Sequence, residues 1–480
     1  MSQYLHLFDT VSAFTEAYNG EAYEEPWVSL TTANGEVNYN KDYTYVYFTL
    51  EILTDGELTW YGGYNGESIS YSKNGGTWET LTFNEGVSVS SGDKIQYKGE
   101  NTELGYCTIN STAQFNAKGN IMSLLYGDDF SDKDELEGGE FTFLFNNCQT
   151  IISAKDLKMP SKKVGQYSFG YNDYEGGGAA FRNCTNLVDA PELPATELGE
   201  ACYAWMFQNC TSLRKAPNLP ATTLAETCYE NMFAGCTSLT GAPSVLPALF
   251  VPSFAYDGMF NGCTSLVTAP EIQATGLGSY ACYYMFSYCE SLTTSPDFHP
   301  TVVAENSCRA MFMDCTSMTT GPTVLPATEL HDQSYWEMFM GCTSLVVAPT
   351  ILATTLGTSC CVAMFEGCTS LTTVQSALPA TTLVRSCYSN MFSGCTSLTT
   401  APILPATTLA NGCYGNMFRG CQNLNFIKAM FTTTPEHDYT YTWVEGVAAS
   451  GTFVKNSSAQ WNVTGTEGVP SGWTVQTASA

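Results

Sequence analysis

A phrase resembling Gly-Cys-Thr-Ser-Leu or Asn-Cys-Thr-Ser-Leu recurs along this chain at a spacing of 26 or 27 residues. A unit of that length is too short to bury its own apolar face, so it must pack against its neighbours. The strict period therefore predicts a stack of near-identical coils over about half of the 480 residues. The cysteines of the ten copies are Cys184, Cys210, Cys236, Cys263, Cys289, Cys315, Cys342, Cys368, Cys395 and Cys421.

One copy indicates how a coil is expected to fold. Cys228, Met232 and Cys236 are spaced at i, i+4 and i+8, which predicts one face of a short helix. Residues 237–242 are rich in threonine, which predicts a strand with Leu239 pointing inward, and a proline then ends that strand. We therefore predict an α/β solenoid with a parallel β ladder, short helical turns and coils about 4.8 Å apart.

The 20 cysteines fall mainly into two columns of the repeat. In two coils the earlier column carries Ala255 or Ser334, although the later Cys263 and Cys342 remain. A required bridge would not keep one partner after losing the other, so we predict buried thiols that act as small apolar groups. A ladder of disulfides is the alternative. The earlier column is Cys202, Cys228, Cys282, Cys308, Cys360, Cys387 and Cys413.

The remainder of the chain divides by its patterning. Residues 41–117 show short alternating strands, with Asn74-Gly75 as a hairpin turn, and they predict a small β-sandwich. Residues 118–183 are expected to form a transition and an N-terminal cap coil, before the repeats of 184–430. Residues 431–480 are expected to close the stack as a C-terminal cap, in which four aromatic residues form an apolar lid. Those residues are Trp443, Phe453, Trp461 and Trp473.

The repeated phrases at 232–239 and 404–409 resemble the BspA-like group of leucine-rich repeats. The stretches 451–455 and 470–475 look like the usual close of such arrays. This resemblance implies a leucine-rich-repeat-like solenoid that serves adhesion or recognition.

Three short stretches near the start of the chain, residues 4–9, 25–30 and 37–41, carry a second likeness. They are similar to the leader of structural proteins of crAss-like phages that infect Bacteroidales. This likeness implies that residues 1–40 are an arm that docks on other virion proteins; the alternative is a strand or two added to the next domain. The docking candidates are Tyr4, Leu5, Leu7, Phe8, Pro26 and Trp27.

Charge and hydropathy narrow the possible partners. The net charge of −28 disfavours nucleic acid and anionic membrane surfaces, because phosphate neutralisation needs clustered lysine and arginine. We recognise no signal peptide and no apolar run of about 18 residues, so we expect no membrane insertion. Together with the phage likeness, this predicts assembly in the host cytoplasm and a location in the virion.

We find no catalytic constellation, metal site or cofactor motif in the sequence. Glu329, Asp332 and Glu337 could pair for glycan hydrolysis, but a solvated return loop is the preferred interpretation. The acidic run at 128–137 could bind Ca²⁺ through oxygen ligands, but it lacks the order of an EF-hand loop. We therefore expect a non-enzymatic protein.

Binding residues are expected where the coils vary while their frame stays constant. Exposed aromatic rings at such positions can stack on sugars or anchor a protein partner, although the tryptophans could instead pack between coils. We therefore expect a phage fibre or receptor-binding protein, present in several copies, that recognises a host surface glycan or protein. A bacterial surface adhesin and a capsule-degrading tailspike are the alternatives. The binding candidates are Trp205, Tyr284, Trp336, Arg214 and Lys215.

Overall fold

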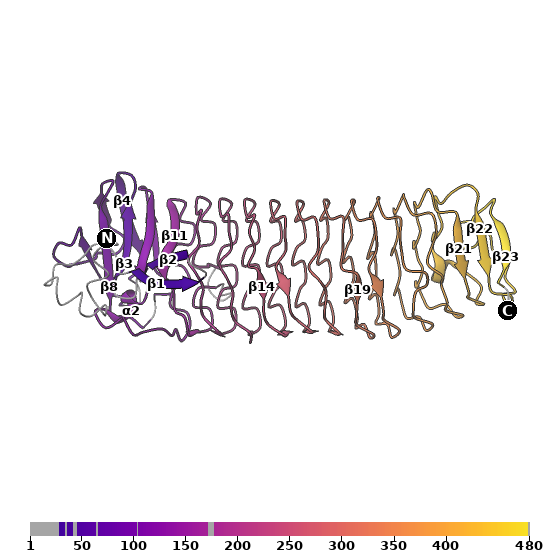
Figure 1. Cartoon of the computed structure of the whole chain (residues 1–480), viewed down its shortest axis with the longest axis horizontal. Helices are drawn as coiled ribbons and strands as arrows, with labels where there is room; N and C mark the ends of the chain where they lie inside the picture. The colour runs from indigo at the N-terminus through magenta and orange to yellow at the C-terminus, as the bar shows by residue number, and fades with distance from the viewer. Residues whose placement is uncertain are drawn as a thin grey trace.

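A computed structural model describes residues 28–33, 36–41, 46–63, 66–102, 104–170 and 177–478. The molecule is a long rod, with a strand-rich region at one end, coils following one another along the axis, and longer strands again at the C-terminal end (Figure 1). Among the described residues, the α-helices are only the short α2 (Ser123–Tyr126) and α3 (His437–Thr440). The chain is therefore a repeat protein with mostly strands and little helix.

Two sheets pack face to face before the repeats. One sheet has the strand order β11-β10-β3-β8-β5-β6 and the other the order β7-β4-β9. Trp60 on β4 contacts Phe48 and Tyr97 of the larger sheet, with ring centroids 6.4 and 5.3 Å away. The strands are β3 (Phe48–Ile52), β4 (Gly56–Tyr61), β5 (Ile69–Lys73), β6 (Glu79–Thr80), β7 (Gly86–Val89), β8 (Lys94–Gly99), β9 (Thr108–Ser111), β10 (Phe115–Asn120) and β11 (Ile151–Lys158).

The predicted hairpin turn is confirmed. Asn74 and Gly75 have φ values of 54° and 73° between the antiparallel strands β5 and β6. Both angles lie in the left-handed region, which asparagine and glycine adopt most readily.

Part of the N-terminal segment forms a hairpin. Strands β1 (Val28–Ala33) and β2 (Glu36–Lys41) pair antiparallel as a two-stranded sheet. The docking candidates Tyr4, Leu5, Leu7, Phe8, Pro26 and Trp27 lie outside the described residues.

The larger sheet leads directly into the repeats. Strand β11 pairs parallel with β10, and Ser153 on β11 forms a parallel bridge with Asp189 of the first coil. Parallel bridges then link coil to coil, and Thr400 bridges Phe426 of β21 (Phe426–Ala429). The sheet thus covers the N-terminal end of the coil stack and protects its open edge. The rungs beyond β21 are β22 (Thr452–Lys455) and β23 (Thr474–Thr477), also parallel.

The repeats contain short parallel strands rather than the longer strand predicted at 237–242, where Gly241 makes only an isolated bridge with Lys215. The inward position of Leu239 is confirmed, since it is fully buried. The short strands are β12 (Lys163–Val164), β13 (Glu197–Leu198), β14 (Val245–Leu246), β15 (Phe250–Val251), β16 (Glu271–Ile272), β17 (Gly276–Leu277), β18 (Val302–Val303), β19 (Val324–Leu325) and β20 (Thr350–Ile351).

The predicted helical turn at Cys228–Cys236 is wrong. Every fourth residue there is left-handed: Thr227, Asn231 and Gly235 have φ values of 56°, 49° and 74°. Within this segment N–H groups alternate, one donating to the carbonyl three residues earlier and the next to a carbonyl of the following coil. The four-residue period of these turns still buries Cys228 and Cys236 on one face, which is why the spacing suggested a helix. The neighbouring coil supplies acceptors that a helix would have to find within itself.

Glycine in this segment occupies positions where the backbone is left-handed. Gly394 has a φ of 72°, and a Cβ added there would meet the Cα of Gly367 at 3.6 Å, an ordinary contact. We expect Gly394→Ala to lower the free energy of unfolding by about 1–2 kcal/mol, because an L residue with a Cβ is strained in the left-handed region. Gly394→Asn should cost less, since asparagine tolerates that region. Urea unfolding of the parent protein and the two variants measures their order of stability. Equal stability of all three would contradict this explanation.

A stack of phenylalanines forms the centre of the repeats. Consecutive rings lie 5.5 to 5.8 Å apart and within 13° of parallel, from Phe207 to Phe418. Columns of leucine and methionine are buried beside them. Each coil therefore contributes the same apolar side chains to one continuous core. The stacked rings are Phe207, Phe233, Phe260, Phe286, Phe312, Phe339, Phe365, Phe392 and Phe418.

The prediction of buried thiols is confirmed, because all 20 cysteines are free and buried. In the later column each Sγ donates to the carbonyl oxygen of a phenylalanine one coil earlier, at 3.0 to 3.2 Å. The carbonyl of Phe207 also accepts the N–H of Cys210, so the Cys236 thiol occupies its second acceptor site. This contact explains a cysteine rather than an alanine at that position.

One detail of the earlier cysteine column is corrected. Cys282 and Cys308 lie one residue later, in the column that holds tyrosine in other coils, and Ala281 and Ser307 occupy the small position. Two bulky rings are thereby missing from neighbouring coils. Phe298 is buried in the adjacent column, where other coils have leucine or isoleucine, and packs edge-on to the next tyrosine, Tyr335, at 6.2 Å. The larger side chain compensates for the lost volume.

We expect no cysteine of the folded protein to react quickly with a thiol reagent such as Ellman's reagent, and all 20 to react after unfolding. Burial raises the pKa of Cys236 to about 12, and the thiolate is the reactive form. Absorbance at neutral pH, with and without denaturant, measures the number of reactive thiols in the unfolded and in the folded protein. Rapid labelling of several thiols in the folded state would contradict the buried columns.

The aromatic residues from which a lid is predicted at the C-terminal end are buried. Trp443, Phe453, Trp461 and Trp473 are all buried, and Trp461 stacks on Phe431 of the preceding coil at 5.3 Å. These large rings cover the last apolar layer.

Candidate functional site

Two neighbouring positions of each coil vary while their surroundings repeat. They lie in the turn segment, just before the buried Met-Phe pair, and we call the surface that they form the turn face. The second position is always left-handed in this set. The pairs are 204–205, 230–231, 257–258, 283–284, 309–310, 336–337, 362–363, 389–390 and 415–416.

The predicted candidate Trp205 lies on the turn face, half-buried. The guanidinium carbon of Arg182 is 4.9 Å from its ring centroid, and its indole Nε1 donates to Glu230 at 3.4 Å. The ring is thus held by charged neighbours from the coils on either side.

Trp336 belongs to a row of side chains from three consecutive coils. The guanidinium carbon of Arg309 lies 4.2 Å from the Trp336 ring centroid and 5.7 Å from that of Tyr283. The Nε atom of Arg309 is 3.8 Å from a carboxylate oxygen of Glu337. A cation between two aromatic rings forms a stiff, amphipathic surface, and all of these side chains are partly exposed. Trp336, like Trp205, is therefore not a core residue.

Sequence reasoning missed Arg309 and Tyr283, although the signal was present. Aligning the coils on their Met-Phe pairs places Tyr283, Arg309 and Trp336 in one column, and side chains of one column in successive coils are neighbours. The candidate Tyr284 lies beside this row, edge-on to Tyr283 with ring centroids 4.3 Å apart.

The candidates Arg214 and Lys215 are exposed elsewhere on the coil. Lys215 lies in the parallel ladder between Asp189 and Gly241, in a different column from Trp205. The structure thus brings Tyr284 and Trp336 into one region and leaves the two basic residues in another.

An acidic residue of the same column has an unusual environment. Burial, followed by the nearby charge of Glu230, raises the pKa of Asp257 to about 8. This carboxyl group lies one coil before Tyr283 in the sequence order of the row.

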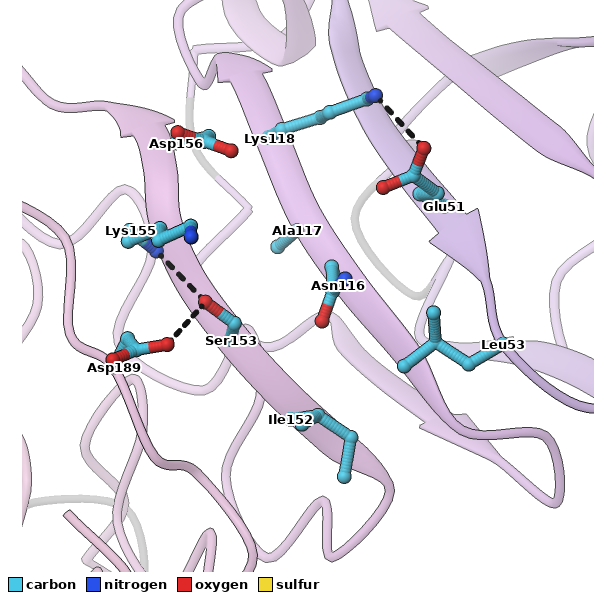
Figure 2. Close-up of a pocket in the computed structure, with 10 residues that line it drawn as sticks. All are labelled: Glu51, Leu53, Asn116, Ala117, Lys118, Ile152, Ser153, Lys155, Asp156 and Asp189. Atoms are coloured by element: carbon cyan, nitrogen blue, oxygen red, sulfur yellow. Dashed lines mark hydrogen bonds and ion pairs between the residues drawn. The ribbon is translucent and has the colours of Figure 1, made fainter. Parts of the chain in front are cut away.

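A shallow groove of about 270 Å³ lies on the larger sheet, where β11 meets the first coil (Figure 2). Two contacts lie within the groove: Lys118 pairs with Glu51 at 3.1 Å, and the Ser153 hydroxyl donates to Asp189 at 3.1 Å. These contacts hold the junction between sheet and repeats together.

The acidic run at 128–137 is occupied by protein partners. Asp128 pairs with Lys98 at 2.7 Å, Asp134 accepts from the Ser161 backbone at 2.6 Å, and Glu137 pairs with Lys163 at 2.6 Å. Within the described ranges, no group of three or more histidine, cysteine, aspartate or glutamate side chains is arranged to hold a metal ion. None of the helices in those ranges is long and apolar enough to span a bilayer.

Comparison with known families finds a likeness in two stretches of the repeats. The model of the BspA-type leucine-rich repeat region matches residues 177–292 and 335–442, in six copies. The repeats in these two stretches are similar to BspA-type leucine-rich repeats. The intervening coils at 293–334 keep the phenylalanine stack through Phe312, and they contain Arg309.

Two solved structures are similar to the chain at low identity. A leucine-rich cell surface protein from Faecalibacterium prausnitzii is 18% identical, with 74% of this chain and 82% of that chain covered and a TM-score of 0.36. A leucine-rich repeat protein from Bacteroides ovatus is 16% identical, with 75% and 84% covered and a TM-score of 0.40. A search of curated proteins found no match.

Proposed function

We propose that this protein is a non-enzymatic attachment protein, whose BspA-type repeats form a solenoid that presents the turn face to a cell-surface glycan or protein. The observation that carries the proposal is the row of Tyr283, Arg309 and Trp336. The rest of each coil repeats the same buried residues, whereas this row supplies partly exposed aromatic and charged groups on a rigid frame. Such groups are the usual anchors of binding surfaces.

We expect Trp336→Ala to weaken binding to target cells at least tenfold, because hot-spot aromatics contribute about 2 kcal/mol or more to recognition. Flow cytometry with the fluorescently labelled protein measures this loss. A second variant, Trp205→Ala, removes the same kind of ring from the turn face of a coil five repeats away. If both variants bind as the parent does, recognition does not use the turn face. Thermal unfolding of each variant separates lost contacts from lost folding.

The proposed setting is a phage virion, in which residues 1–40 dock on other virion proteins and several copies of the repeats face outward. A bacterial cell-surface adhesin is the second candidate, and the BspA-type family match favours it. Mass spectrometry of purified phage particles and surface labelling of intact bacteria distinguish the two. A capsule-degrading tailspike would release reducing sugar from host polysaccharide, and the proposal predicts no such release.

A further inference from the structure

One coil carries an unusual set of tyrosines. Tyr280, Tyr284 and Tyr288 occupy its three left-handed positions, with φ values of 58°, 51° and 60°. Other coils place mainly glycine, asparagine, alanine or serine at these positions. A bulky L residue is strained in that region by about 1–2 kcal/mol, so the three tyrosines cost the fold stability.

Packing offsets that strain at only one of the three tyrosines. Tyr280 stacks on Phe254 of the preceding coil, with ring centroids 4.7 Å apart. Tyr288 is 42% exposed and Tyr284 is half-buried, so their rings add little to the core. Backbone strain that brings no packing benefit is a sign of function. The rings of Tyr284 and Tyr288 are thus best explained by what they contact outside the chain.

The coil before the tyrosines leaves space beside Tyr288. Its left-handed positions are Phe254, Gly258 and Gly262. Gly262 is half-buried, and a Cβ placed on it would meet only the backbone of Gly235, at 3.8 Å. Gly258 is buried, and the Asn231 amide oxygen lies over it, 2.3 Å from where an added Cβ would be. The partly exposed Gly262 and the amide that covers Gly258 therefore form a shelf beside the tyrosine coil.

The surrounding charge is mainly negative. Asp314 occupies the position of Tyr288 in the next coil. Burial raises the pKa of the Tyr288 phenol, followed by the charges of Asp314, Tyr284 and Glu337. The one nearby cation of the row, Arg309, already pairs with Glu337 and stacks between two rings. Carboxylates and an amide accept hydrogen bonds from hydroxyl groups and repel anions.

We infer that the tyrosine coil, with the shelf of Gly258 and Gly262, is a binding site for an uncharged glycan. The apolar face of a sugar ring stacks on Tyr284 or Tyr288, and its hydroxyl groups donate to Asn231, Asp314 or Glu337. An oligosaccharide lying along the rod would reach Trp336 two coils on, about 10 Å away at a coil spacing of about 4.8 Å. This inference deepens the proposed function and depends on it.

The test compares the whole chain with a double variant, Tyr284→Gly and Tyr288→Gly. Immobilised probes are neutral oligosaccharides of mannan, galactan and glucan type, sialylated and sulfated oligosaccharides, and an oligolysine peptide. We expect binding to at least one neutral probe, and a loss of at least tenfold in the variant. We also expect the variant to unfold at the same or a higher urea concentration, because glycine relieves the left-handed strain.

The control is Ala201→Gly, which changes a left-handed position of another coil, outside the turn face, without removing a ring; it should leave glycan binding unchanged. Binding to no neutral probe, or only to the acidic or cationic probes, would overturn the inference. So would a variant that is clearly less stable, since the tyrosines would then be structural. Cell binding that persists while neutral probes fail, and that protease treatment of the cells removes, would keep the proposed function and reject the glycan.

Discussion

Replacing Phe286 with alanine is expected to lower the free energy of unfolding by about 3–5 kcal/mol. Its ring is fully buried in the middle of the phenylalanine stack, 5.5 Å from the rings of Phe260 and Phe312. The substitution leaves a cavity that the neighbouring coils cannot close, because backbone hydrogen bonds between coils hold them at a set spacing. Urea unfolding followed by circular dichroism measures the loss.

The matched control is Phe250→Ala, since Phe250 is 58% exposed on β15. The same chemical change there should cost less than about 1 kcal/mol, because surface substitutions remove few contacts. Similar losses for the two variants would mean that the central stack is not the main source of stability.

The second large effect concerns the pH dependence of stability at Asp257. Its folded-state pKa of about 8 lies above the ordinary value of 3.8, so the folded protein holds a proton that the unfolded chain releases. The stabilising contribution of the protonated carboxyl group is fully present below about pH 4 and is lost as the pH rises towards 8. We expect a change on the order of a few kcal/mol across this range.

Asp257→Asn isolates this contribution, because the amide has nearly the shape of the protonated acid but does not titrate. Urea midpoints of both proteins at several pH values from 4 to 9 should converge at low pH and diverge at high pH, with the variant the more stable. Parallel curves would show that Asp257 ionises normally.

Some features of this protein could be predicted from patterns in the sequence alone. The 26 or 27 residue period predicted stacked coils, and backbone hydrogen bonds between successive coils join residues 25 to 27 positions apart, such as Phe207 and Met232 or Glu271 and Ser244. Asn74-Gly75 predicted its turn, because few other pairs accept positive φ at both positions. The uneven retention of cysteine in two columns predicted free thiols, and every cysteine is free.

The helix was predicted wrongly because periodicity does not show where a backbone N–H finds its acceptor. Buried residues four apart, such as Cys228 and Met232, fit both a helix and a series of four-residue turns. In this segment of the folded chain every second N–H donates to the next coil, and that acceptor exists only once the coils are stacked.

The candidate site divides in the same way. The sequence alone identified the variable positions and the aromatic candidates Trp205, Tyr284 and Trp336, because positions that differ between repeats can be found by comparing the repeats in the sequence. Only the tertiary structure placed Arg309 between Tyr283 and Trp336, and only the backbone angles showed that Tyr284 is held under strain. Contacts between coils join residues about 26 positions apart, so their energies depend on an alignment in space that no local segment contains.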